Sequence, residues 1–224
     1  MLGGDAGLFR VVALSLGVSL GATLVASVLG LPAGAALAVL RVPGRRGLIL
    51  LANALLGLPP VVVGLALYLM LSRSGPLGGL GLLFTPAAMV LAPVLLALPI
   101  VVALAHRAAD GIWRTYGDDL RVNGASRAQA IRTVLAIGRA EMLTAVLAGF
   151  GRTVSEVGAI LVVGGNIAGY TRTMTTSIVL ETSQGNLAFA LALGGVLVSI
   201  SLAVSATAFA LAARQGHAAP RRSA

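Results

Sequence analysis

Residues 11–40 read VVALSLGVSLGATLVASVLGLPAGAALAVL, a run without a single charged side chain. A helix needs about 20 apolar residues to cross the hydrocarbon core of a bilayer. The run is long for one crossing and short for two crossings joined by a turn. Because Pro32 and Gly34 lie near its end, we expect one tilted helix with a kinked or exposed end.

Four more apolar runs follow this one along the chain. They cover residues 47–72, 86–105, about 140–163 and about 187–213, and only the run over about 140–163 is interrupted, by Arg152 and Glu156. The sequence therefore predicts an all-α polytopic membrane protein with about five transmembrane helices, or six if the first run crosses twice. No stretch is long enough for a soluble domain, so residues 1–224 form one transmembrane domain.

The composition excludes several classes of protein. Of the 224 residues, 58% are hydrophobic and 10% charged, and the mean hydropathy is +0.98, whereas a soluble domain is about 25% charged. A soluble enzyme, a disordered chain and a nucleic-acid binder are excluded, although the net charge is +9. The chain has no Cys and no Lys, so it offers neither a disulfide nor the Lys of a phosphate-binding Walker loop.

The arginines predict the orientation, because positive charge concentrates on the cytoplasmic side of a membrane protein. Three segments hold 12 of the 16 arginines: Arg41, Arg45 and Arg46; Arg107, Arg114, Arg121, Arg127, Arg132 and Arg139; and Arg214, Arg221 and Arg222. With five spans, the N-terminus then lies outside and the C-terminus in the cytoplasm. The loops 73–85 and 164–186 face outside.

The segment from residue 107 to residue 139 is the most polar part of the chain and reads as two short helices. Thr115 with Asp118 fits a capping box for the first helix, and Asn123-Gly124 fits its end. Ser126 with Gln129 fits a capping box for the second.

The second helix is expected to be amphipathic, with one apolar face. Two interpretations stay open at this point: the helix docks onto a partner, or it lies on the membrane surface with its arginines on lipid phosphates. The apolar face consists of Ala128, Ile131, Val134 and Leu135.

The same segment resembles the EAA loop of the permease subunits of bacterial ABC importers. The stretch Asp118-Asp119-Leu120-x3-Gly124-Ala125-Ser126-Arg127 keeps the Gly of the family pattern at its offset. It departs where the family has Glu-Ala-Ala, and Ala136-Ile137 stands where the family has Leu-Pro. In the family, this loop inserts into a cleft of the ATPase subunit. The resemblance implies a cytoplasmic coupling loop over about 107–139, with the contact in 118–137 made by Asp118, Asp119, Gly124, Ala125, Ser126, Arg127, Ile131 and Val134.

Further blocks resemble the permeases of tungstate importers over nearly the whole chain. Two segments, Met174-Thr175-Thr176 and Leu180-Glu181-Thr182-Ser183, favour tungstate over the related molybdate permeases. The other blocks are Leu58-Pro59-Pro60-Val61-Val62-Val63-Gly64, Ser72-Arg73-Ser74-Gly75-Pro76-Leu77-Gly78, Gly149-Phe150-Gly151-Arg152-x3-Glu156-Val157-Gly158-Ala159 and Val163-Gly164-Gly165-Asn166-Ile167-x-Gly169-Tyr170-Thr171-Arg172.

This resemblance implies the type I ABC importer permease fold and a homodimer around a central path in the plasma (inner) membrane, surrounded by lipid. It also implies a cytoplasmic ABC ATPase subunit that holds the ATP and an extracytoplasmic tungstate-binding protein. The chain itself is then a permease and not an enzyme, with no cofactor, no metal site and no nucleic-acid partner.

Several membrane-embedded polar positions are candidates for the path of the anion. Pro59 and Pro60 break the second span near its middle, where irregular backbone is tolerated only against protein or water. Arg152 and Glu156 are four residues apart and should face the bundle and pair, either as a structural ion pair or as a gate. The outer loop adds Asn166, Thr175 and Thr176, whose donors suit an oxyanion or simply cap the bundle.

Other functions are weighed on the same residues. A permease for molybdate or another oxyanion is the first alternative. A secondary transporter is the second, but it should show internal repeats and coupling carboxylates at the midplane. Here the single internal carboxylate, Glu156, has Arg152 as its partner. Small residues at helix-packing spacing, Gly17 with Gly21 and Gly30 with Gly34, indicate packing within the chain or a dimer seam.

Overall fold

The computed structural model describes residues 4–40 and 43–217, and all regular structure in these ranges is helical. Of the arginines used for the orientation, Arg41, Arg221 and Arg222 lie outside the described residues. The elements are α1 (Gly4–Val39), α2 (Arg45–Ala54), η1 (Leu55–Gly57), α3 (Pro60–Leu71), η2 (Gly78–Leu80), α4 (Pro86–Val122), α5 (Arg127–Ile137), α6 (Arg139–Val154), α7 (Gly158–Gly164), α8 (Met174–Ser183) and α9 (Leu187–His217).

Three helices cross the molecule from end to end without a break. α1, α4 and α9 are each long and apolar enough to span a bilayer, and up to five spans result if each strongly bent helix pair counts as one. The first apolar run forms the single helix α1, which continues through Pro32. This removes the reason for counting six spans.

The second span is broken where the sequence predicts it. α2 and η1 end at Gly57, α3 begins at Pro60, and the two parts are bent by 103°. Pro60 stands in the first turn of α3, where the missing N–H of proline costs nothing, and Pro59 adopts an extended conformation before it.

Two short helices were expected after the third span, and the first of them is not a separate helix. α4 continues without interruption to Val122 and, at 1.5 Å per residue, is about 55 Å long, well beyond the about 30 Å of the hydrocarbon core. Thr115 does not cap a helix, because its hydroxyl donates to the carbonyl of Gly111 within α4. Nothing between Ala105 and Val122 breaks the helix, since this stretch has no proline.

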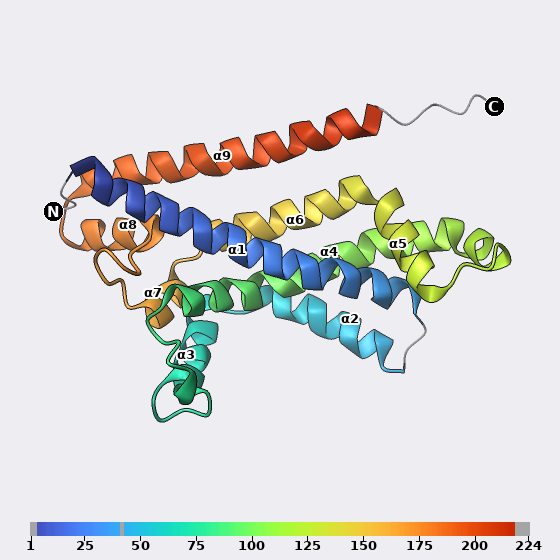
Figure 1. Ribbon diagram of the computed structural model, residues 1–224, viewed down its shortest axis with the longest axis horizontal. Coiled ribbons are helices and arrows are strands. Elements are labelled where there is room, and N and C mark those ends of the chain that lie inside the picture. The colour runs from blue at the N-terminus through green and yellow to red at the C-terminus, as the bar shows by residue number, and fades with distance from the viewer. Residues whose placement is uncertain (1–3, 41–42, 218–224) are drawn as a thin grey trace.

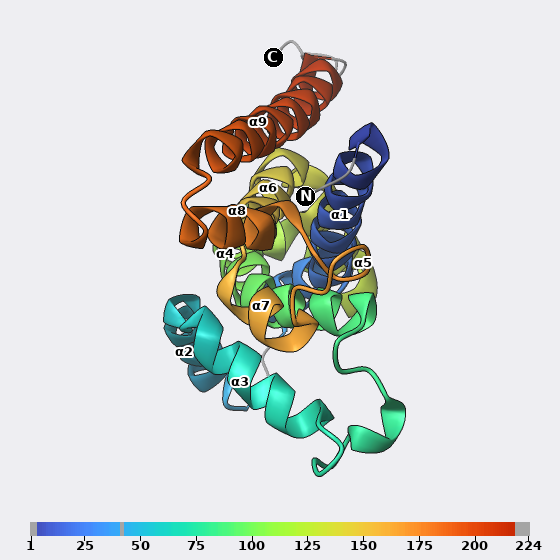
Figure 2. The ribbon, with the colours of Figure 1, turned by 90° about the vertical axis from the view of Figure 1, so that its left-hand side faces the viewer.

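The molecule is a bundle around α1, α4 and α6, with the remaining long elements on opposite sides of it (Figures 1 and 2). α9 lies along one side, and α2 and α3 lie along the other. Only 11% of the apolar window of α9 is buried, against 56% for α4. α9 is therefore mostly uncovered in a single copy of the chain.

Small residues bring α1 and α4 close together. A Cβ atom added at Gly30 would lie 2.8 Å from a methyl group of Val101, and one at Gly34 would lie 2.7 Å from the backbone nitrogen of His106. The prediction of packing within the chain is confirmed for this pair of glycines. Gly17 has open space around it and Gly21 makes only an ordinary contact, at 3.9 Å from Val90.

The expected outer loop 164–186 contains a helix of its own. α8 begins at Met174, and Thr173 caps it in a capping box with Thr176. Residues 174–177 are buried, and the backbone N–H of Met174 donates to the hydroxyl of Ser15 on α1 at 2.7 Å. Satisfying its first N–H groups with side chains allows this helix end to be buried.

Candidate functional site

The turn between α4 and α5 matches the sequence prediction in detail. α4 ends at Val122, and Gly124 has a φ of 70°, in the left-handed region that favours glycine. The hydroxyl of Ser126 accepts from the backbone N–H of Gln129 at 3.3 Å, and the Gln129 side chain accepts from the N–H of Ser126 at 2.8 Å. This reciprocal box is the capping box that the residues predict.

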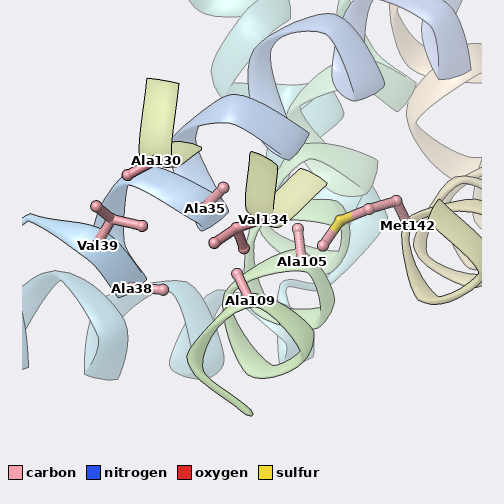
Figure 3. Close-up of a cluster of buried hydrophobic side chains, with 8 residues drawn as sticks. All are labelled: Ala35, Ala38, Val39, Ala105, Ala109, Ala130, Val134 and Met142. Carbon is pink, nitrogen blue, oxygen red and sulfur yellow. The ribbon is translucent and has the colours of Figure 1, made fainter. Parts of the chain in front are cut away.

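The predicted coupling residues divide into an exposed tip and a buried anchor. Asp118, Asp119, Gly124, Ser126 and Arg127 are exposed, and Ala125 and Ile131 are partly buried. Val134 is fully buried among Ala35 and Val39 of α1 and Ala105 and Ala109 of α4 (Figure 3). Val134 therefore holds α5 on the bundle, and the predicted coupling residues that are accessible to another protein are those at the tip.

The apolar face of α5 differs by one position from the prediction. Ala128 is exposed, and Ala130 is buried in its place, beside Val134 (Figure 3). Because α1 and α4 already cover this face, it is not free to enter lipid. The apolar face of α5 is therefore neither a docking face nor a face that enters lipid, and the exposed residues of the tip are the ones left for a partner.

Charged groups tie the elements together at this end of the molecule. Asp110 of α4 pairs with Arg45 of α2 at 3.0 Å and with Arg114 at 2.7 Å. Near the tip, Arg121 pairs with Asp118 at 2.8 Å and stacks over the ring of Trp113, 5.0 Å from its centroid. Because the Asp118 side chain is exposed, this pair contributes little stability.

Arg152 and Glu156 form the predicted pair, although the helix between them is broken. α6 ends at Val154, and a nitrogen of Arg152 lies 3.4 Å from Oε2 of Glu156. The other oxygen of Glu156 accepts from the backbone N–H of Ala159 at 2.9 Å and so caps α7. The carboxylate is buried, whereas 28% of the Arg152 side chain is exposed. The pair thus consists of a fixed buried anion and a cation that other ligands can reach.

The structure brings several other predicted positions to this pair. The hydroxyl of Thr175 donates to the carbonyl of Glu156 at 3.1 Å, and Thr176 belongs to the capping box one residue further on. The break at Pro59 and Pro60 also lies nearby, because a Cβ atom at Gly158 would meet Val61 at 2.9 Å and Pro60 at 3.7 Å. The break before α3 therefore lies against the break between α6 and α7 (Gly158–Gly164).

Asn166 is not part of this group. It lies in the connection between α7 and α8 with a φ of 50°, and its carbonyl accepts from Arg172 at 3.4 Å. Its side-chain oxygen is buried without a partner among the residues that the structure describes.

A row of buried hydroxyl groups on α1 was not predicted. Thr153 of α6 donates to the carbonyl of Ser19 at 3.2 Å, and its hydroxyl lies 2.9 Å from that of Thr23. A signal was present in the sequence, because the residues of the row recur every four positions and so share one face of a helix. The row consists of Ser15, Ser19, Thr23 and Ser27, all buried.

Comparisons with known proteins place the chain in a family. The probable anion ABC transporter permease protein of Haloferax volcanii is 39% identical over 204 residues, which are 89% of this chain and 88% of that protein. The tungstate uptake system permease protein TupB of Peptoclostridium acidaminophilum is 36% identical over 211 residues, 92% of this chain and 91% of that protein. The chain belongs to this family of ABC transporter permeases.

Another relative widens the range of substrates named within this permease family. The molybdenum transport system permease protein ModB of Azotobacter vinelandii is 37% identical over 132 residues, 54% of this chain and 57% of that protein. No general family model matches the chain. The resemblance read from the sequence is confirmed at the level of an oxyanion ABC permease, an all-α multi-pass membrane protein.

Proposed function

We propose that this chain is the membrane-spanning permease subunit of an ATP-driven importer for tungstate. The observation that carries the proposal is the similarity to a tungstate uptake permease over 92% of this chain and 91% of that protein. Molybdenum permeases match less well, at 30–37% identity over 54–80% of this chain. Tungstate therefore fits better than molybdate, which stays the alternative substrate.

The exposed tip of the α4–α5 turn is the proposed contact with a separate ATPase subunit. Gly124 and the Ser126 cap fix the angle between α4 and α5, and Val134 anchors α5 to the bundle. A force on the tip would be transmitted along α4, a single helix from this turn to Pro86. ATP would bind to the partner subunit, and this chain would need no cofactor.

Two copies of the chain, together with an extracytoplasmic binding protein that delivers the anion, complete the proposed assembly. Five spans are too few to enclose a wide gated path, and the largely uncovered α9 supports a further copy or lipid beside it. The coupling tip would face the cytoplasm and the α7–α8 connection would face outside. The N-terminus would then lie outside and the C-terminus inside the plasma membrane.

The path of the anion is proposed to pass Arg152. A dianion in the membrane needs a positive charge and hydrogen-bond donors, because its desolvation is otherwise too costly. Arg152 is partly exposed and is held by Glu156 at 3.4 Å. It also lies beside the place where two broken spans meet, which is where transporters commonly form their sites.

The test is uptake into proteoliposomes that contain the permease with its ATPase and binding-protein partners. Uptake of tungstate should require hydrolysable ATP, should persist when an ionophore collapses the proton gradient, and should be displaced by tungstate at lower concentration than by molybdate, sulfate or phosphate. Equal competition by sulfate would remove the tungstate assignment and leave the transporter class standing. Uptake that follows the proton gradient without ATP would remove the class itself.

A further inference from the structure

Three arginines lie at the end of the molecule that faces outside in the proposed orientation. They are Arg10 near the start of α1, Arg73 after α3 and Arg172 just before α8 (Figure 1). Positive charge in short outer segments opposes the orientation signal of a membrane protein. These arginines are therefore expected to have a role other than orientation.

Arg10 and Arg172, which we call the outer arginine pair, lie against one loop of the α7–α8 connection. The loop covers residues 166–172. A Cβ atom added at Gly169 would lie 3.6 Å from Nη1 of Arg10, and Nη2 of Arg172 donates to the carbonyl of Asn166 at 3.4 Å. Two guanidinium groups from distant parts of the chain thus reach the same short loop.

Hydrogen bonds fix the shape of this loop. The buried hydroxyl of Thr171 accepts from the N–H of Ile167 at 2.9 Å and donates to the carbonyl of Gly164. The carbonyl of Ile167 accepts from three N–H groups further along the loop, at 3.0–3.2 Å. Ala168 and Gly169 form the exposed tip, and their N–H groups have no acceptor among the residues that the structure describes. The tip therefore presents free donors on a fixed backbone.

The outer arginine pair also has unused donors. A guanidinium group carries several N–H donors, yet Arg172 makes a single long hydrogen bond and its Nε is buried without a partner. Arg10 has neither a hydrogen bond nor an ion pair within the described part of the chain. The loop contains no acidic residue, and the next one along the chain, Glu181, is held by Asn186 at 2.8 Å. Because a buried donor without an acceptor is costly, this arrangement favours an anionic ligand.

We propose that the outer arginine pair and the tip of loop 166–172 bind a tetrahedral oxyanion as it enters the permease. The inference rests on the proposed function and adds a binding site at the outer surface, which the ion would occupy before it reaches Arg152. The fork of guanidinium donors matches the oxygens of such an ion, and N–H groups of a turn can add to it.

A free ion fits this site better than a carboxylate on the surface of a binding protein. Arg172 is only partly exposed, so a small ion can reach its donors where a rigid protein surface cannot. Binding should be weak, because an ion that is to be transported must also leave the site. Sulfate should bind as tungstate does, since the donors recognise only charge and shape.

The experiment measures how fast phenylglyoxal modifies each arginine of the full-length chain in phosphatidylcholine nanodiscs, peptide by peptide, by mass spectrometry. The chain has no Lys and no Cys whose side chains would compete for the reagent. Once tungstate exceeds its dissociation constant about tenfold, modification of Arg10 and Arg172 should slow by about tenfold relative to sodium chloride of equal ionic strength. Arg73, an exposed arginine at the same end but outside the loop, is the matched control and should not change.

Variants test whether the two arginines act together. Arg172→Gln should raise the tungstate concentration that half-protects Arg10 by about tenfold, because a charge-assisted hydrogen bond is lost. Arg10→Gln should do the same for the protection of Arg172, whereas Arg73→Gln should change neither. Unchanged thermal unfolding in detergent shows that the variants are folded.

The outcomes separate this site from the function on which it rests. Absence of protection in the wild-type chain, or equal protection of Arg73, would overturn the site even if ATP-dependent tungstate uptake persists. If protection is absent and Arg172→Gln instead raises the concentration of binding protein needed for uptake, the pair is a docking surface. Protection by phosphatidylglycerol nanodiscs that does not increase with tungstate would assign the pair to lipid headgroups and also overturn the site.

Discussion

At the scale of single residues, the pair of Arg152 and Glu156 is the point where stability and transport can be separated. The Glu156 carboxylate is buried and does two things, since one oxygen caps α7 and the other faces Arg152. A buried charge that loses its partner is strongly destabilising, whereas removing both charges often costs little. Arg152 as the partner of Glu156 and Arg152 as a ligand of the anion therefore predict different outcomes for single and double variants.

We expect Arg152→Met to lower the stability of the permease by about 3–5 kcal/mol, because it leaves the Glu156 carboxylate buried and unpaired. Adding Glu156→Gln should restore most of this loss, since Gln can still accept the N–H of Ala159. Thermal unfolding in detergent measures both effects. If Arg152 contacts the anion, the stable double variant should still fail to transport. A double variant that transports at the wild-type rate would show that the pair is only structural.

At the scale of elements, the α4–α5 turn shows how much local residues can specify. Gly124 supplies the left-handed conformation, and Ser126 and Gln129 begin the next helix, so both features were visible in the sequence. The continuity of α4 was not visible in the sequence, because a Thr and an Asp three residues apart fit a helix start as well as a helix interior. The hydrogen bond from Thr115 to the carbonyl of Gly111 shows that Thr115 lies in a helix interior.

The sequence predicted which residues belong to the candidate site, but not how they are arranged in space. The charged pair at Arg152 and Glu156 and the break at Pro59 and Pro60 follow from the cost of polar groups and proline in a membrane. That the two breaks meet could not be predicted, since it depends on α3 packing against α7 through Gly64 and Ala159, residues far apart in the chain. The burial of the start of α8 likewise depends on Ser15, a distant residue of α1 whose hydroxyl accepts from the N–H of Met174.

The turn also allows a test of coupling. Gly124→Val should place a β-branched residue at a φ of 70°, which costs about 1–2 kcal/mol, although no atom lies within 4 Å of the new Cβ. We expect it to abolish transport and weaken co-purification of the ATPase. Ser126→Ala removes a cap worth about 0.5–2 kcal/mol and should be intermediate.

Gly124→Asn is the matched control, because Asn tolerates the left-handed conformation. It should keep both transport and the ATPase. All three variants should insert into the membrane, since the spans are unchanged. A Gly124→Val permease with full transport and a bound ATPase would show that the turn has no docking role.

The contact between α1 and α4 gives a prediction about helix packing. Gly34→Leu should be destabilising by about 1–3 kcal/mol or more, because its Cβ would lie 2.7 Å from backbone atoms of α4, which cannot yield as a side chain can. Gly17→Leu lies on the same helix with open space around it and should be neutral or slightly stabilising. Thermal unfolding in detergent compares the two. Equal loss at both positions would show that α1 does not pack on α4 in the membrane as it does here.

At the scale of the whole molecule, the two ends differ in charge. The end that holds the start of α2 and the α4–α5 turn carries Arg45, Arg46, Arg121 and Arg127 (Figure 1). The opposite end holds the start of α1 with Arg10, the α3–α4 connection with Arg73 and the α7–α8 connection with Arg172. Segments far apart in the sequence thus gather their arginines at one end. This gathering supports the orientation inferred from the positive-inside rule.

The orientation can be measured directly with reporters fused along the chain. Fusions at residues 44 and 125 should report the cytoplasm, and fusions at residues 80 and 168 should report the outside, because each pair lies at a common end of the bundle. The fold predicts which fusions lie on the same side of the membrane, and the arginines predict which side is the cytoplasm. A cytoplasmic signal at residue 168 together with an outside signal at residue 125 would invert the orientation and keep the fold. Signals that differ between residues 44 and 125 would instead contradict the fold, since α1 and α4 would then not run in parallel through the membrane.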